Sequence, residues 1–374
     1  MNDNGRRLTI LHTESSLGWG GQEIRILEES RVMMSRGHSL RLLCPPDARI
    51  ATAAMRYGVP VTVVPMGRKN VRGWLAVRSW LKDHPVDVIV THSSTDSWLV
   101  ALAAQTLSHP APIVRLRHIS TAVPDNWATR WLYTRASRHI VTTGVAIREQ
   151  LINVNRFPGQ QITSIPTGID LDRFVPGHRD ETRQRLRLVS DGPIIGIVAT
   201  LRSWKGHVYL FQAFREMVTD GLAPAPLLVV VGDGPGEDNL HRLAAELQIT
   251  DRVHFAGHQI DPVPWLQALD LFCLPSYGNE GVPQALMQAM ACALPVVSTP
   301  VGSIPEIVSS GENGVLVPPK DSRTLAATLK RLWLDPGLRH HLGQAASATA
   351  RSRFGIEAMA QAMEALLTRV AVTR

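Results

Sequence analysis

Cysteine is scarce in this chain, which has only three among its 374 residues. Cys44, Cys273 and Cys292 are too few and too scattered for a disulfide framework or a zinc cluster. No apolar run reaches the roughly 18 residues that would span a bilayer, and residues 1–7 have no apolar stretch long enough for a secretory signal. These absences argue against a disulfide-stabilised or membrane-spanning protein, and we expect a protein of a reducing cytoplasm.

Charged residues are also few, at 19%, whereas hydrophobic residues make up 44%. This balance excludes a disordered polyelectrolyte and a coiled coil, and the length leaves room for two or three domains with their own cores. Lys and Arg number 39 against 32 Asp and Glu, giving a net charge of +7 and a pI near 9.8. Such a charge favours polyanionic partners: nucleic acid, an anionic membrane or phosphorylated small molecules. The chain has no helix-turn-helix, zinc-finger or aromatic RNA-binding motif, so we expect no nucleic-acid partner.

Short β-rich runs alternate with longer helical patterns along most of the chain. Between the first two runs, the pattern predicts a helix over 22–36 with Ile24, Leu27 and Met34 on its packed side and Gly37 as its cap. Such alternation predicts an α/β fold of doubly wound parallel sheets with helices on both faces. The predicted strands are 8–11, 40–43, 61–64, 86–90, 113–116 and 139–142, then 194–199, 227–231, 253–255, 271–274 and 296–297.

A polar, arginine-rich stretch interrupts the alternation between Pro166 and Asp191. We therefore expect two Rossmann-like domains, at residues 1–178 and 190–350, and a closing amphipathic helix within 352–374. Ligands of such sheets bind at the carboxyl ends of the strands, where loops meet helix N-termini. Residues at those ends are the candidates for function.

Two of the segments after predicted strands are suited to an anion. Gly20 and Gly21 precede the first helix, where backbone N–H groups suit a phosphate; a plain capping turn explains them equally well. Arg202 and Lys205 lie three residues apart after the first strand of the second domain, so both could reach one anion. Each charge-assisted hydrogen bond would contribute about 1.5–3 kcal/mol. The alternative is a pair of solvated basic residues on a loop.

Two further segments follow strands of the second domain. Gly232-Asp-Gly-Pro-Gly is similar to a dinucleotide fingerprint, but the third glycine of that pattern falls on Glu237, so either a nucleotide contact or a structural turn remains open. Glu280 follows the strand 271–274, and Pro283 suits the start of a helix. Glu280 is therefore expected to meet the reacting end of a ligand, and Gln288, along that helix, a more distant part; a mere helix cap is the alternative.

The block Glu280-Gly-Val-Pro through Gln288-Ala-Met-Ala, with Leu294-Pro-Val-Val after it, resembles the signature of retaining GT-B glycosyltransferases of family four. Supporting matches appear in the family's order and cover nearly the whole chain. The resemblance implies two Rossmann-like domains across a cleft, the first on the acceptor side and the second binding a nucleotide sugar. These matches are Gly18-Trp-Gly-Gly-Gln-Glu, Pro166-Thr-Gly-Ile-Asp, Arg202…Lys205-Gly206 and Gly232-Asp-Gly-Pro.

The resemblance also implies roles for single residues. Arg202 and Lys205 would hold the donor diphosphate, Glu280 would bond hydroxyls of the transferred sugar, and His118 would contact that sugar as the active-site histidine. The family usually has a second glutamate where this chain has Gln288, and an amide is a weaker acceptor for ribose hydroxyls. The implied donor-binding set is Gly20, Gly21, Gly232, Gly281, Val282, Pro283 and Gln288.

The chemistry expected of this site needs no metal ion and no cofactor. Arg202, Lys205 and helix dipoles can stabilise a leaving diphosphate directly. The metal-binding pattern Asp170-Leu-Asp172 lies beside Pro166-Thr-Gly-Ile, where the family has a structural turn, so we expect no metal there. Retention is expected by front-side attack, with the leaving phosphate oxygen accepting the acceptor's proton.

The first domain offers fewer clues about the acceptor. Residues 68–82 combine basic side chains with Trp74 and Trp80 on one predicted helix, and 127–135 form a second basic, aromatic cluster. Both suit an anionic membrane surface, although a solvated surface helix is equally consistent. We expect a cytoplasmic enzyme that visits the inner face of the membrane for a lipid-linked, lipopolysaccharide or other glycan acceptor. The alternatives are a nucleotide-sugar epimerase or hydrolase and a non-catalytic binding homologue.

Overall fold

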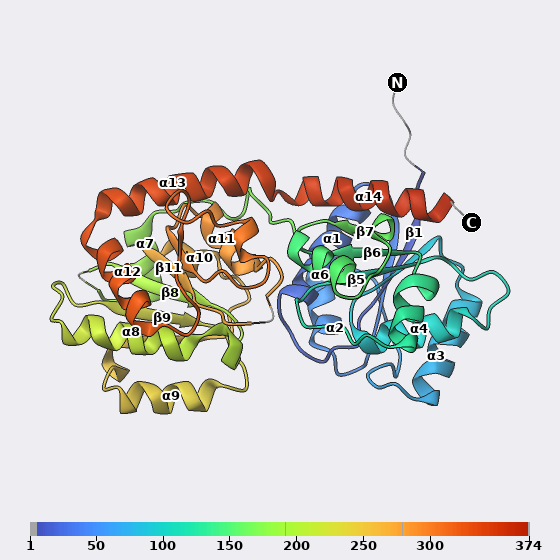
Figure 1. Cartoon of the computed structure of the whole chain (residues 1–374), viewed down its shortest axis with the longest axis horizontal. Coiled ribbons are helices and arrows are strands. Elements are labelled where there is room, and N and C mark those ends of the chain that lie inside the picture. Colours follow the sequence, from blue (N-terminus) through green and yellow to red (C-terminus); the bar gives the residue numbers. More distant parts are fainter. Residues whose placement is uncertain (1–5, 191, 279, 373–374) are drawn as a thin grey trace, which may run out of the picture. The chain divides into compact units, whose positions relative to one another are not determined.

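The computed structural model describes residues 6–190, 192–278 and 280–372, and it divides into two compact units (Figure 1). The first unit runs to Gly168 and resumes at Ile356; the second is Ile169–Gly355. The division therefore falls before residue 178, because Ile169 and Phe174 are buried in the hydrophobic core of the second unit.

The first unit is built on a parallel sheet of seven strands in the order β3-β2-β1-β4-β5-β6-β7. His12 of β1 lies opposite Val90 of β4, so the central strands run in register. The doubly wound sheet predicted from the sequence is confirmed, but β7 was missed because only one of its three residues, Ile162, is apolar. The strands are β1 (Thr9–Thr13), β2 (Ser39–Cys44), β3 (Val61–Val63), β4 (Val88–Thr91), β5 (Ile113–Arg117), β6 (His139–Thr142) and β7 (Ile162–Ser164).

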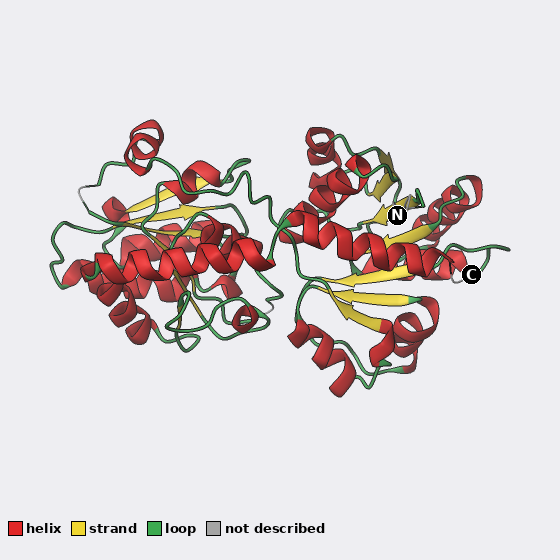
Figure 2. Cartoon of the chain, turned by 90° about the horizontal axis from the view of Figure 1, so that it is seen from above, coloured by secondary structure: helices red, strands yellow, loops and turns green. Residues whose placement is uncertain are grey.

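Helices cover both faces of this sheet, as Figure 2 shows. The last helix, α14 (Ile356–Val372), returns from the far end of the chain and packs against α1 (Gly21–Ser35) (Figure 1). Its buried side is formed by apolar residues at helical spacing, such as Met359 and Met363. The other helices are α2 (Arg49–Ala54), α3 (Val71–Asp83), α4 (Ser94–Ala104), α5 (Trp127–Trp131), which continues as a π-turn to Ala136, and α6 (Val145–Asn153).

The packed face of α1 differs from the prediction. Leu27 is wholly buried as expected, but Ile24 and Met34 are only half-buried. Their place in the interior is taken by Arg25 and Glu29, both with fully buried side chains. Counting apolar positions missed this face, because a charged pair can be buried when its members neutralise each other.

The second unit contains a parallel sheet of six strands in the order β10-β9-β8-β11-β12-β13. The predicted strands over 227–231 and 271–274 match the structure, whereas the two-residue β13 was missed. The strands are β8 (Ile194–Val198), β9 (Leu227–Val231), β10 (Val253–Gly257), β11 (Leu271–Leu274), β12 (Val296–Ser298) and β13 (Val315–Leu316). The helices are α7 (Arg179–Leu186), α8 (His207–Thr219), α9 (Glu237–Glu246), α10 (Val263–Gln267), α11 (Gln284–Ala291), α12 (Ser322–Leu334) and α13 (Pro336–Arg353).

All three cysteines are free thiols in the hydrophobic cores. Burial raises the pKa of Cys44 and of Cys292 to about 12 and raises that of Cys273 as well. Within the described ranges, no helix has the length and apolar character needed to cross a bilayer.

Candidate functional site

The predicted site residues lie near the points where each sheet reverses its strand order. In the first sheet this point lies between β1 and β4, and His118 follows the adjacent strand β5. In the second sheet it lies between β8 and β11, with Arg202 and Lys205 after β8 and Glu280 after β11. Open α/β sheets bind ligands at such points. Each unit therefore has one candidate edge.

In the second unit, the structure brings Lys205 and Glu280 together. Lys205 Nζ lies 2.7 Å from Glu280 Oε1, and Ser276 Oγ donates a hydrogen bond of 2.6 Å to the same oxygen. The backbone N–H of Tyr277 donates to the carbonyl of Trp204, so the loops after β8 and β11 are tied together. Two fixed donors thus set the orientation of the carboxylate.

This ion pair is largely withdrawn from water. The Lys205 side chain is 18% exposed and the Glu280 side chain 5%. Removing one partner of a buried pair leaves an uncompensated charge, which typically destabilises a protein by about 3–5 kcal/mol. Each charge therefore depends on the other for its place in the fold.

Arg202 lies at the exposed start of the same loop. Its guanidinium lies over the ring of Trp204, with Cζ 5.2 Å from the ring centroid. A guanidinium stacked on a ring keeps its edge N–H donors for a ligand. Because Glu280 neutralises Lys205, the three side chains together have one net positive charge.

Two glycines allow the loops of this pair to approach closely. Gly206 has φ +77°, and a Cβ there would lie 1.9 Å from the carbonyl oxygen of Pro275. Gly302 has φ +57°, and its Cβ would lie 2.0 Å from the carbonyl oxygen of Glu280. Gly302 was not predicted as a site residue. Its only signal was its place shortly after β12, a few residues beyond the block from Glu280 to Val297.

The glycines of the loop after β9 pack against the segment that leads to Arg202. A Cβ on Gly232 would lie 2.0 Å from the carbonyl oxygen of Ala199, and one on Gly234 would lie 2.8 Å from the backbone nitrogen of Leu201. This close approach explains the glycines as a structural turn. Contact of Gly232 with a nucleotide stays a prediction.

A buried turn links Glu280 to α11. It consists of Gly281, Val282 and Pro283. Pro283 is the N-cap, so α11 begins at Gln284, one residue after the start that the sequence suggested. Leu286 and Met290 face the core as predicted. Gln288 is also buried, and Gln284 Oε1 has no hydrogen-bond partner among the described residues.

In the first unit, the glycine segment forms the entrance to α1. Gly20 is the N-cap in an extended conformation and α1 begins at Gly21. No side chain caps this helix, so its first N–H groups are available for an anion. A contact of these glycines with a ligand stays a prediction.

His118 belongs to a line of three histidines. Its Nε2 lies 3.0 Å from His92 Nδ1, and His92 Nε2 lies 2.8 Å from His12 Nδ1. The backbone carbonyl of His118 accepts a hydrogen bond from Thr143 Oγ1. The sequence singled out His118 alone, because the three residues are distant in sequence and only the order β1-β4-β5 brings them together.

Basic side chains gather beside the start of α4, near this line. Lys69 Nζ donates to Ser94 Oγ at 3.1 Å, and burial together with the charge of Arg115 lowers the pKa of Lys69. Arg115 is buried against the ring of Tyr133, and its Nε has no hydrogen-bond partner in the described part of the chain. Arg115 was not predicted as a site residue. Its signal is a charged residue between the apolar residues Val114 and Leu116 of β5.

Two carboxyl groups are also buried at this edge. Asp96 Oδ2 accepts hydrogen bonds from Thr13 Oγ1 and from the backbone of His92. Burial raises the pKa of Glu14 to about 8, with contributions from the charges of Asp96 and Glu23. Neither acid was predicted, because a short strand followed by a polar residue gives no sign of complete burial.

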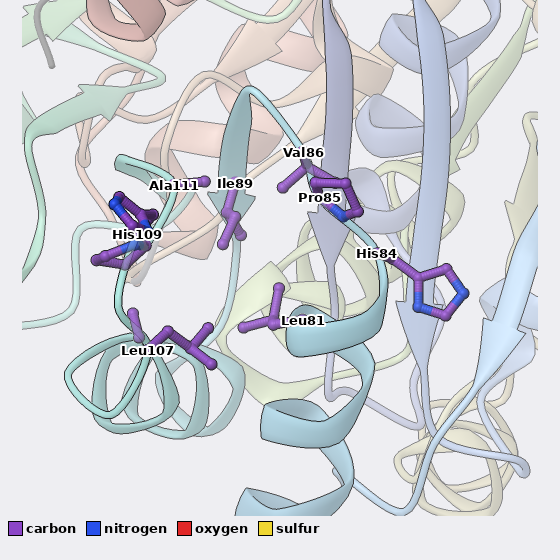
Figure 3. Close-up of a pocket in the computed structure, with 10 residues that line it drawn as sticks. Leu81, His84, Pro85, Val86, Ile89, Leu107, His109 and Ala111 are labelled. Carbon is purple, nitrogen blue, oxygen red and sulfur yellow. The ribbon is translucent and has the colours of Figure 1, made fainter.

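A separate pocket of about 150 Å³ opens in the first unit (Figure 3). It lies where β4 begins, with Val86 and Ile89 on its wall and Leu81 and Leu107 at its base. Ligands of parallel sheets bind at the opposite, carboxyl ends of the strands. This pocket is therefore apart from the residues described above.

The Asp170-Leu-Asp172 segment forms a turn. Asp170 Oδ1 accepts hydrogen bonds from the backbone N–H groups of Asp172 and Arg173. This use of the carboxylate agrees with the structural turn expected there. The described residues contain no group of three or more His, Cys, Asp or Glu side chains arranged to hold a metal ion.

Two family models match the chain in succession. The family described as Glycosyltransferase Family 4 matches residues 19–173, and Glycosyl transferases group 1 matches residues 178–349. Together they cover both units.

Named relatives extend the match over most of the length. The D-inositol 3-phosphate glycosyltransferase of Stackebrandtia nassauensis is 31% identical over 368 residues, covering 87% of this chain and 82% of its own. The lipopolysaccharide core biosynthesis glycosyltransferase LpsE of Rhizobium meliloti is 31% identical over 185 residues, covering 50% of this chain and 52% of its own.

A solved structure has the same fold. Anabaena Alr3699/HepE in complex with UDP and glucose matches with a TM-score of 0.86 and 22% identity, covering 97% of this chain and 100% of its own. At this identity the likeness shows the fold alone. The ligands of this chain must be inferred from its own residues.

Proposed function

Because the chain belongs to the family 4 glycosyltransferases of the GT-B fold, we propose that it moves a hexosyl unit from a nucleotide-diphosphate sugar to a lipid-linked or lipopolysaccharide acceptor. We further propose that the transfer retains the anomeric configuration and needs no metal ion. The observation that supports this most is the buried Lys205–Glu280 pair beside Arg202, at the point where the second sheet reverses its strand order.

The proposed chemistry follows from these charges. Cleavage of the sugar–phosphate bond leaves negative charge on the diphosphate and positive charge on the anomeric carbon. Arg202 and Lys205 stabilise the diphosphate, while Glu280 accepts hydrogen bonds from sugar hydroxyls. The acceptor oxygen bonds the anomeric carbon on the face from which the phosphate leaves, and the acceptor's proton passes to the released phosphate oxygen.

Substitution of the charged groups tests this assignment. Nucleotide sugars are first screened for thermal stabilisation of the protein, since a ligand of the folded state raises its melting temperature. With the donor that binds, Arg202→Ala and Glu280→Gln are expected to lower kcat by about 10²-fold, as loss of one preorganised stabiliser does. Arg331→Ala, at an exposed position of α12, serves as the control. Near-normal rates in both site variants would reject the proposal.

The same assay tests stereochemistry and metal dependence. The anomeric proton coupling of the first-formed product distinguishes retention from inversion. A chelator is expected to leave the rate unchanged. An inverted product or a lost rate would remove that part of the proposal while leaving sugar transfer in place.

The basic residues of the first unit support an acceptor with an anionic group. Lys69 and Arg115 flank the N-terminus of α4, and the buried Arg115 Nε has no hydrogen-bond partner among the described residues. Phosphate groups suit such a position. Two relatives are named for an inositol phosphate and for lipopolysaccharide core. We infer that the acceptor of this chain likewise has a phosphate or another anion.

A membrane-bound acceptor is supported by one exposed surface. Val71 and Leu75 of α3 and Trp127 of α5 are exposed apolar side chains. Both helices flank α4, which contacts α3 and stacks Trp98 on Trp131. With the lysines and arginines of 68–82, this surface suits the anionic inner face of the cytoplasmic membrane. Salt-sensitive flotation with anionic liposomes, lost in Trp127→Ser with Val71→Ser, is the expected result. No binding by the unaltered protein would count against it.

Gln288, in place of the glutamate usual in this family, is the residue that supports two alternative functions. A nucleotide-sugar hydrolase or epimerase would change the donor without an acceptor, and a non-catalytic homologue would bind the donor without turnover. Product analysis with and without acceptor separates these cases. We expect transfer to exceed hydrolysis once the acceptor is present.

A further inference from the structure

The three histidines of the first unit form a hydrogen-bonded chain. His12 Nδ1 and His92 Nε2 are 2.8 Å apart, and His92 Nδ1 and His118 Nε2 are 3.0 Å apart. Successive rings are inclined by 16° and 31°, with centroids 5.1 and 5.3 Å apart. These are the nearly coplanar, edge-to-edge contacts of N–H···N hydrogen bonds in series.

The hydrogen-bonded histidines His12, His92 and His118 have only two consistent arrangements of protons. Burial lowers the pKa of His12 to about 3 and those of His92 and His118 well below their usual value, so all three rings are neutral at physiological pH. A neutral imidazole has one N–H and one lone pair. Because His92 uses both nitrogens, its single proton decides the direction of both hydrogen bonds. The three tautomers must therefore change together.

In the first arrangement, His92 Nε2–H donates to His12 and His118 Nε2–H donates to His92. His12 then has its proton on Nε2, and His118 has a lone pair on Nδ1. In the second arrangement every proton is on the other nitrogen of its ring. His12 then presents a lone pair at Nε2, and His118 presents an N–H at Nδ1.

Glu29 selects the first arrangement. Its Oε1 lies 4.0 Å from His12 Nε2, and its Oε2 lies 3.4 Å from Arg25 Nε, with all three side chains buried. Burial raises the pKa of Glu29 and the charge of Arg25 opposes this. A guanidinium keeps its proton and needs a counter-charge when buried, so Glu29 is ionised. At 4.0 Å the carboxylate acts through its field, which favours an N–H over a lone pair at His12 Nε2, whereas the charge of Arg25 lowers the pKa of His12 and opposes this effect.

We propose that His12 and His92 are positioning residues that hold His118 as its Nε2–H tautomer, under the control of Glu29. His118 Nδ1 is then the ring nitrogen of the chain that remains for a substrate, and it accepts a hydrogen bond. It binds a hydroxyl that donates, as sugars offer, and disfavours a group that only accepts. The identity of that hydroxyl rests on the proposed function, whereas the tautomer does not.

The tautomer is measured directly on the purified full chain. In protein labelled with ¹⁵N-histidine at pH 7.5, imidazole nitrogen shifts distinguish N–H from lone-pair nitrogens, and His118→Gln identifies the His118 signals. We expect protonated Nε2 and unprotonated Nδ1 at His118. A protonated Nδ1 at His118 would overturn the proposal whatever the enzyme transfers.

Breaking the chain at its inner end tests the control by Glu29. His12→Phe is expected to give a mixture of His118 tautomers and to lower kcat/KM by about tenfold, the low end of what outer hydrogen-bond partners contribute in other sites. His139→Gln is the control. His139 is a buried strand histidine that hydrogen-bonds Thr163 and does not belong to the row of three histidines. An unchanged His118 tautomer in folded His12→Phe protein would refute the proposal that His12 and Glu29 set this tautomer. Should that variant not fold, His12→Asn and the spectrum of the unaltered protein decide.

These outcomes are separate from the proposed function. The expected tautomer without any transferase activity would leave the proposal on the tautomer intact and reject sugar transfer. Transferase activity with the opposite tautomer would do the reverse.

Discussion

At the scale of single residues, Gly302 supports the position of Glu280 through the absence of a side chain. Its φ of +57° is rare for other residues, and a Cβ would collide with the carbonyl oxygen of Glu280. Gly311 has φ +87° but a Cβ there would meet nothing within 4 Å. Substitution at Gly311 therefore introduces backbone strain alone, whereas substitution at Gly302 introduces the same kind of strain and a steric collision.

We predict that Gly302→Ala destabilises the protein by more than 2 kcal/mol, whereas Gly311→Ala costs about 1–2 kcal/mol from strain alone. The extra loss in Gly302→Ala comes from moving the backbone of Glu280, so its kcat should fall as well. Thermal melting and the transferase assay measure the two effects. Equal melting temperatures for the two variants would show that the collision is relieved without cost.

Site residues could be predicted from the sequence where they lie in a recognisable motif close to a predicted strand. Lys205 and Glu280 each lie in a loop directly after a strand, and the structure brings them into contact. His12 and His92 could not be named in the same way. Each ends or follows an ordinary apolar strand, and their relation to His118 depends on which strands are neighbours, which no spacing along the chain records.

At the scale of elements, α14 completes the first unit from the other end of the chain. Met359, Met363, Leu366 and Leu367 are buried in the core that α1 and the first sheet form. The same face is readable from the sequence, because apolar residues recur at helical spacing. What the spacing does not tell is which surface the helix covers.

We predict that Met363→Ala destabilises the first unit by about 2–5 kcal/mol, because the wholly buried side chain leaves a cavity. Gln361→Ala, at an exposed position of the same helix, should leave stability within about 0.5 kcal/mol. Hydrogen exchange would locate the loss in the first unit. Matching exchange rates in the two variants would mean that α14 adds little to this core.

Strand prediction succeeded where the strands are buried on both faces. The runs over 227–231 and 271–274 are continuous apolar segments, which parallel sheets covered by helices require. The edge strand β7 has a single apolar residue and β13 has only two residues, so neither stands out as an apolar run. The burial of Arg25 was also beyond the sequence, because it relies on the carbonyl of Ile165, which follows β7 and is 140 residues away along the chain.

At the scale of the whole molecule, buried histidines make the fold sensitive to acid. Burial lowers the pKa of His12 and of His207 to about 3 and that of His139 to about 4. Below pH 6.5 the unfolded chain binds protons that the folded chain does not, so the free energy of unfolding falls as pH decreases. Each such histidine lowers the free energy of unfolding by about 1 kcal/mol between pH 7 and pH 5.5. The shifted histidines on which this rests are His12, His92, His118, His139 and His207.

Glu14 acts in the opposite direction. Its raised pKa adds stability that is complete below its unfolded value and is lost as pH rises through about 8. Burial also raises the pKa values of Glu29 and Asp96, which act in the same direction as Glu14. The five histidines outweigh these three carboxyls below about pH 6, whereas the carboxyls dominate above about pH 7. We therefore predict greatest stability near neutral pH, measured by urea unfolding. His207→Gln should flatten the acid side, and His340→Gln, at an exposed position, should not. A profile unchanged by His207→Gln would contradict the buried, neutral state of that ring.

The three sequestered thiols also decide how this enzyme reacts with electrophiles. Alkylating reagents attack thiolates, and the interior of each unit keeps Cys44, Cys273 and Cys292 protonated and out of reach. Maleimide incorporation accordingly reports loss of native structure. A single cysteine introduced on the surface can be labelled with a fluorophore without first deleting the natural ones, so the motion of either unit during turnover is open to direct observation.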